Sequence, residues 1–165
     1  MNSVDANSSK KQTGDQKIDG LSPKLFSNWK VQPFTECIEH TPGISRKLKK
    51  NEIKGAGKFP VIDQGDIFIS GYTDIKSNVY AVTLPIIIFG DHTRHIKYVD
   101  FEFAVGADGT KIIRPKPFYD IRFFYQYLKS LNWQQSGYGR HFKYLKQINV
   151  PLPPLSEQKR IVAKL

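Results

Sequence analysis

The chain has 165 residues, of which 39% are hydrophobic and 13% aromatic, enough for one globular domain with a substantial core. Lys and Arg outnumber Asp and Glu by 25 to 15, and the net charge of +10 favours a polyanionic partner. The sequence has no apolar run of membrane-spanning length and no apolar signal core, and its one cysteine, Cys37, excludes an internal disulfide or a CxxC zinc site. We therefore expect a cytoplasmic protein without a membrane partner.

The sequence up to residue 113 predicts a polar N-terminal segment, then a short helix, then a region of short strands. Residues 1–20 are polar and aperiodic, and we expect no fixed structure there, with the folded domain over 21–149. An extended opening leads into a short helix from Phe34 to Glu39. Residues 59–113 are rich in β-branched and aromatic side chains separated by turn residues. This pattern predicts short strands at 59–63, 67–70, 78–82, 84–89, 96–99, 103–105 and 110–113.

A helical stripe follows the strands. Apolar residues repeat at helical spacing after Pro117, which predicts a helix that opens at this proline. A glycine-containing loop at 136–139 and a short helix over 141–148 follow. The fold class is therefore expected to be α+β, with one mixed, mainly antiparallel sheet and flanking helices. The residues of the stripe are Ile121, Phe124, Tyr125, Leu128 and Leu131.

The C-terminal residues combine a proline-rich stretch with the start of a helix. Prolines at 150–155 fix extended geometry and predict a rigid hinge. Ser156 is expected to cap a helix over 156–165, and Glu157 suits the positive end of its dipole. One face of this helix carries Gln158, Ile161, Val162 and Leu165.

Two basic segments are candidates for contact with nucleic acid. Residues 46–58 hold six cations and one acid, and residues 138–146 hold three cations, one histidine, three aromatic residues and no acid. Lys and Arg neutralise phosphates, and nearby glycines allow close approach of the backbone. A solvated surface is the alternative for the first segment, and packing is expected for Phe142 and Leu145 in the second. The candidates are Arg46, Lys47, Lys49, Lys50, Lys54, Lys58, Arg140, His141 and Lys143.

Polar loop residues are candidates for reading base edges, because this task requires directional donors and acceptors. Arg suits guanine, and Asn or Gln suits adenine. For His92, capping of its own turn is an equal alternative. The candidates are Thr73, Asp74, Lys76, Asn78, His92, Arg94, Gln134 and Gln135.

The turn at Asp91, His92 and His95 is the one place that suggests chemistry. No further ligand cluster stands at a diagnostic spacing, and the sequence lacks both a glycine-rich cofactor loop after a strand and an Asn/Asp-Pro-Pro-aromatic motif. We therefore expect no catalytic residue, no metal and no cofactor. Two alternatives stay open: a free-standing metal-dependent nuclease using Asp91 and His92, and a non-specific basic adaptor for RNA or a protein.

Six short strings stand in order along residues 29–165. They are Pro60-Val61-Ile62, Gly90-Asp91-His92-Thr93-Arg94, Gly106 to Lys111, Phe123 to Leu128, Arg140 to Leu145 and Ile148 to Val162. Together they resemble the DNA target-recognition domain, and its junction with a spacer helix, in specificity (S) subunits of type I restriction–modification systems. Each string alone is weak, but their order is specific.

The resemblance implies sequence-specific binding of duplex DNA, with one half of a split, asymmetric target read by a non-catalytic subunit. Methyl transfer from S-adenosylmethionine and ATP-driven cleavage would belong to partner methyltransferase (M) and restriction (R) subunits. Residues 156–165 would begin a long spacer helix, whose Gln158, Ile161, Val162 and Leu165 pack against a partner helix, including that of a second copy in a homodimer. Family members usually have two such domains, so the chain is expected to be a fragment or a half-subunit.

Overall fold

The computed structural model describes residues 29–41, 44, 46–106, 109–131 and 139–165. The segment 1–20 and the candidates Gln134 and Gln135 lie outside the described residues. The strands are β1 (Lys30–Pro33), β2 (Phe59–Ile62), β3 (Gly71–Thr73), β4 (Ile86–Gly90), β5 (Ile96–Val99), β6 (Ala104–Val105), β7 (Thr110–Ile113) and β8 (Asn149–Leu152). The helices are α1 (Phe34–Cys37), α2 (Ile121–Ser130), α3 (Phe142–Leu145) and α4 (Leu155–Val162), with 3-10 turns η2 (Lys50–Glu52) and η3 (Lys76–Asn78).

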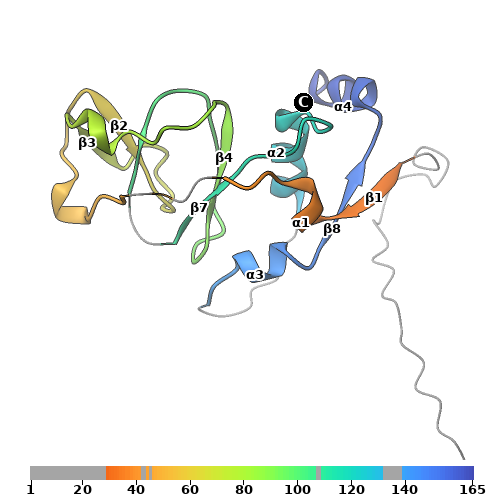
Figure 1. Ribbon diagram of the computed structural model, residues 1–165, viewed down its shortest axis with the longest axis horizontal. Coiled ribbons are helices and arrows are strands. Elements are labelled where there is room, and N and C mark those ends of the chain that lie inside the picture. The colour runs from red at the N-terminus through yellow and green to blue at the C-terminus, as the bar shows by residue number, and fades with distance from the viewer. Residues whose placement is uncertain (1–28, 42–43, 45, 107–108, 132–138) are drawn as a thin grey trace, which may run out of the picture.

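The α+β class and the mainly antiparallel pairing are confirmed, but the strands form three small sheets instead of one. Their orders are β1-β8, β3-β2-β6 and β5-β4-β7, and the pairing of β2 with β6 is the parallel one. The helices gather at the β1–β8 end of the molecule, and the β3-β2-β6 sheet lies at the other end (Figure 1). The strands form separate sheets because most of them are too short to reach from one end of the molecule to the other.

Strand β4 connects the two halves of the core. All five of its residues are buried, because both faces of its sheet are covered. Since side chains alternate along a strand, Ile87 and Phe89 pack toward the helices, while Ile86 and Ile88 pack toward the other sheet. The helix-side cluster includes Phe34, Ile113, Phe124, Leu128 and Val150, and the other cluster includes Ile62, Val99, Phe103 and Val105.

Helix α2 contains the predicted stripe but begins later than Pro117. Asp120 is its N-cap, and Oδ1 accepts hydrogen bonds from the backbone N–H groups of Arg122 (2.9 Å) and Phe123 (3.1 Å). Because a carboxylate satisfies otherwise unpaired N–H groups at a helix start, the helix begins directly after Asp120 instead of at the proline. The short helix expected over 141–148 is reduced to α3.

Two predicted strands are wrong. Residues 67–70 form an irregular loop, and strand β3 begins only after them, at Gly71. Residues 78–82 contribute a single bridge, between Val79 and Ala104, after the 3-10 turn η3. Apolar side chains alone do not make a strand, which also requires a neighbour that accepts its backbone hydrogen bonds.

The proline-rich segment expected to be a hinge is strand β8 through Leu152. It pairs antiparallel with β1, with Pro151 opposite Val31 and Pro33 opposite Asn149. Proline lacks an N–H donor, but it is tolerated in a two-stranded sheet because each strand has an open edge. This pairing ties the two ends of the described domain together.

Helix α4 also differs from its prediction. It begins at Leu155 after Pro154, and Ser156 provides no cap. Gln158 is fully buried inside the domain, so the prediction that it packs on a partner helix is wrong. Ile161 and Val162 are half-buried against the helix-side core, and Leu165 remains 77% exposed.

Candidate nucleic-acid interface

The first basic segment is anchored across the β3-β2-β6 sheet. Leu48 bridges to Gly106 beside β6, and Lys54 pairs with Tyr72 of β3 through two backbone hydrogen bonds of 2.9 Å. Leu48 and Ile53 pack on Val61 and Ala104 of the sheet. We call residues 46–58 the basic crossover. Its apolar residues face the sheet, and most of its cations therefore face solvent.

Several cations in and beside the crossover have carboxylate partners. Arg46 pairs with Glu52 (2.5 Å) and Lys54 with Asp74 (3.0 Å), and both pairs are solvent-exposed. A backbone hydrogen bond from Lys49 and the Arg46 guanidinium lower the pKa of Glu52. Exposed pairs of this kind add little stability. Their main effect is to compensate the positive charge locally.

Other cations of the crossover have no such compensation. Among the described residues, no carboxylate lies within ion-pair distance of the side-chain ammonium of Lys47, Lys49, Lys50 or Lys58. Lys58 and Lys76 approach the Phe59 ring, with Nζ 5.4 and 5.0 Å from its centroid. Lys76 also pairs with Glu102 at 2.8 Å. The uncompensated positive charge of the crossover therefore lies at Lys47, Lys49, Lys50 and Lys58.

The second basic segment is held in place by Asp91. Its buried carboxylate accepts a hydrogen bond from the backbone N–H of Phe142 (2.8 Å) and lies 3.8 Å from Lys111 Nζ. Its backbone carbonyl accepts from His141 N–H (2.7 Å), and its own N–H donates to the carbonyl of Gly109 (2.8 Å). One aspartate thus joins the β4–β5 turn, the start of β7 and α3.

This junction gathers cations from three segments. Lys111 and Lys146 approach the Phe142 ring, and Lys143 Nζ lies 5.0 Å from the centroid of the half-exposed Tyr144 ring. We call Arg94, Lys111, Arg140, Lys143 and Lys146 the α3 cluster. An exposed aromatic ring among cations is an arrangement that binds the backbone and bases of nucleic acids.

Side chains of the turn that suggested a metal site make contacts within the domain. Asp91 is engaged as described above, and His95 Nδ1 lies 3.7 Å from Asp66 Oδ1. Within the described part of the chain, no three His, Cys, Asp or Glu side chains gather to hold a metal ion. The same residues include no helix with the length and apolar character needed to cross a membrane.

Comparison with known proteins decides the family. Residues 27–165 match the family described as type I restriction modification DNA specificity domain. The chain belongs to this family. The specificity subunit of the type I restriction enzyme EcoR124I/EcoR124II from Escherichia coli is 30% identical over 93 residues, which are 54% of this chain and 23% of that subunit.

Solved structures of type I systems share the fold. The S subunit from M. genitalium superposes with a TM-score of 0.61 at 20% identity, covering 83% of this chain and 38% of that one. A chain from a study of complex assembly and conformational transition in the type I system gives 0.62 at 19% identity, covering 90% and 39%. This specificity domain therefore spans less than half the length of these relatives.

Three predicted DNA contacts lie inside the specificity domain. Thr73 and Asn78 are buried, and Thr73 Oγ1 accepts from Asn78 Nδ2 (3.4 Å) and from the N–H of Ile75 (3.3 Å). His141 is also buried, and burial lowers its pKa, with a further contribution from Arg94. These side chains shape loops, so their assignment as surface contacts is corrected.

The other candidates among the described residues are exposed or half-buried, and the structure adds further ones. Lys76 is exposed, and His92 and Arg94 are half-buried in the β4–β5 turn, where Arg94 has a φ of 65°. Lys111, Tyr144 and Lys146 were missed as candidates. The sequence could have indicated Tyr144 and Lys146, because both are neighbours of Leu145, which is the buried residue of the one-turn helix α3.

Proposed function

We propose that this domain reads one half of a bipartite duplex DNA target as the specificity component of a type I restriction–modification enzyme. The observation that carries this proposal is the family match over residues 27–165. The net charge of +10 and the two basic surfaces support it, because phosphate neutralisation supplies much of the affinity for DNA.

The proposed division of labour follows the geometry. The basic crossover and the α3-cluster residues other than Arg94 would hold phosphates and fix the domain on the duplex, since cations on well-anchored segments lose little freedom on binding. His92 and Arg94 would face base edges. An arginine on a turn tip is suited to the two acceptors of guanine in the major groove.

In the same proposal, the domain acts together with M and R subunits. Methyl transfer and cleavage would reside in M and R subunits, and this chain would contribute no catalytic group. Leu165, which is exposed beyond the end of α4, would pack against a partner helix, either within one subunit or between two copies.

The proposal is tested by mapping methylated bases in cells that carry the specificity subunit containing this domain together with its M and R subunits. A recurrent split motif should appear, and Arg94→Ala should change or abolish one half of it. Val31→Ser, at an exposed position on β1, is the matched control and should leave the motif unchanged. If the assembled complex methylates no recurrent motif, the domain does not read sequence.

Purified protein separates the alternatives. Fluorescence anisotropy with labelled duplex should show tighter binding to the mapped half-site than to a scrambled duplex. Equal competition by RNA and both duplexes would favour the non-specific adaptor. Mg²⁺-dependent strand breaks that disappear in Asp91→Asn would favour the nuclease.

A further inference from the structure

The loop between β2 and β3 presents two adjacent apolar side chains to solvent. Ile67 is 73% exposed and Phe68 is 42% exposed. The Phe68 ring packs edge-on against Phe101, with centroids 6.1 Å apart. We call Ile67, Phe68 and Phe101 the apolar tip. Scattered exposed apolar residues are ordinary, but a contiguous group on a fixed loop indicates an interaction site.

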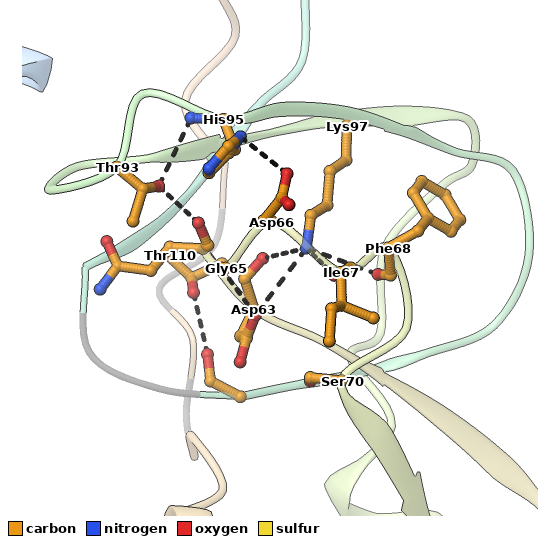
Figure 2. A network of polar contacts seen from close by, with 12 residues as sticks. Asp63, Gly65, Asp66, Ile67, Phe68, Ser70, Thr93, His95, Lys97 and Thr110 are labelled. Carbon is orange, nitrogen blue, oxygen red and sulfur yellow. Dashed lines mark hydrogen bonds and ion pairs between the residues drawn. The ribbon is translucent and has the colours of Figure 1, made fainter.

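A buried lysine holds this loop in place (Figure 2). Lys97 of β5 is only 5% exposed, and Nζ donates to the backbone carbonyls of Ile67 (2.7 Å) and Asp63 (2.9 Å). Its ammonium also lies 3.8 Å from Asp63 Oδ1. Burial lowers the pKa of Lys97, and the carboxylates of Asp63 and Asp66 partly offset this effect. A buried ammonium requires several acceptors, and here the loop backbone provides them.

Further hydrogen bonds fix both ends of the loop. Gln64 Oε1 accepts from the N–H of His92 (3.0 Å), and the Gln64 carbonyl accepts from Thr93 Oγ1. At the other end, Ser70 N–H and Oγ both donate to the carbonyl of Val61 (2.9 and 3.0 Å). The tip is therefore ordered before any partner arrives, which reduces the entropy lost on binding.

The charge around the tip is opposite to that of the chain as a whole. Asp66, whose side chain is 89% exposed, precedes Ile67, and exposed Asp100 and Glu102 flank Phe101. Glu102 is partly compensated by Lys76. Carboxylates next to an apolar anchor repel DNA phosphates but attract a protein surface that carries Lys or Arg.

We propose that the apolar tip docks a protein partner whose surface has an apolar hollow bordered by basic residues, and that this partner is the methyltransferase subunit of the same complex. The inference rests on the proposed function, which supplies that subunit. It adds a contact on the specificity domain itself, separate from any contact made by the helix that begins with α4.

The test measures binding of purified methyltransferase subunit to the chain carrying Ile67→Lys or Asp66→Asn. A lysine at the tip would place a charge in the apolar hollow beside basic residues. We therefore expect the dissociation constant to rise roughly tenfold or more for Ile67→Lys, as for other central interface anchors. Asp66→Asn should weaken binding less and reduce its salt dependence. Both side chains are exposed, and circular dichroism would verify folding.

Two controls make the result decisive. Val31→Ser, at another exposed apolar position, should leave methyltransferase binding unchanged. Binding of DNA without the methyltransferase subunit should change little in Ile67→Lys. Tighter DNA binding with a steeper salt slope would instead place the tip against DNA and overturn the inference. Unchanged methyltransferase affinity, or no complex with the unaltered chain, would overturn it as well, whereas the proposed function fails only if sequence-specific DNA recognition is absent.

Discussion

Lys97 and Asp91 are charged residues whose main contacts are with backbone groups of other segments. Lys97 lies under the β2–β3 loop, and Asp91 lies between β4, β7 and α3. In both cases, a charge inside the domain fixes the position of a surface segment. Removing one partner from such a contact leaves the other buried and unsatisfied, which costs more free energy than the contact itself contributes.

Lys97→Met should therefore destabilise the domain by about 2 to 4 kcal/mol, because it leaves at least two carbonyls without their donor. The midpoint of urea unfolding, with an unchanged slope, would measure this loss. Lys143→Met, at an exposed position, is the matched control and should stay within about 0.5 kcal/mol of the unaltered chain. Equal stability of both variants would mean that water replaces the ammonium.

His141 should make stability depend on pH. Because burial and Arg94 lower its pKa in the folded domain, the unfolded chain takes up a proton at higher pH than the folded one. The contribution of neutral His141 is thus fully present above the unfolded pKa of about 6.5 and is lost as the pH falls toward the lower folded value. In His141→Gln, the free energy of unfolding should vary less between pH 7 and 5. A pH dependence identical to that of the unaltered chain would contradict this assignment.

At the scale of elements, the sequence predicts the helices and strands whose residue pattern can be recognised within the element itself. Strands β5 and β7 have the predicted bounds, and the stripe centred on Phe124 and Leu128 forms α2, because alternation and helical spacing are read within one element. Strand β8 was missed because its partner β1 lies more than a hundred residues earlier. Likewise, the buried positions of Thr73 and His141 depend on contacts with distant segments, which a polar residue in a loop does not reveal.

Gln158 is a polar residue of α4 whose side chain bonds to three backbone groups of other segments. Its Oε1 accepts from the N–H of Asp120 (2.7 Å), and Nε2 donates to the carbonyls of Phe118 (3.0 Å) and Pro153 (2.9 Å). The side chain thereby connects α4 to the start of α2. These bonds explain why a polar residue on the apolar face of α4 is fully buried.

Gln158→Leu should release α4 from the domain. The substitution leaves three backbone groups without their partner, at about 1 to 3 kcal/mol for each group that water does not reach. Hydrogen exchange should become faster in α4 and in the first turn of α2, while β4 keeps its protection. Lys159→Leu, at the neighbouring exposed position, is the control. Unchanged exchange in α4 would show that the packing of Ile161 and Val162 suffices to hold it.

At the scale of the whole molecule, net charge is a poor guide to which cations meet DNA. The basic crossover and the α3 cluster lie in separate places, at the β2–β3 end and beside β8 (Figure 1). Within the crossover, Arg46 and Lys54 already have carboxylate partners, whereas Lys50 has none among the described residues. A cation that keeps its carboxylate partner contributes little net charge to a phosphate.

The salt dependence of DNA binding should therefore distinguish these cations. Each lysine or arginine that neutralises a phosphate releases condensed counterions and contributes about 0.9 to the slope of log K against log salt concentration. Lys50→Ala and Arg140→Ala should each flatten this slope by about that amount, whatever the DNA sequence. Arg46→Ala should change the slope far less, because the Arg46 guanidinium is paired with Glu52 and does not neutralise a phosphate. Anisotropy titrations at several salt concentrations would measure all three slopes. Equal slopes in all variants would mean that both basic surfaces face solvent in the complex, and a strong effect of Arg46 alone would show that its pair with Glu52 opens to meet the phosphate.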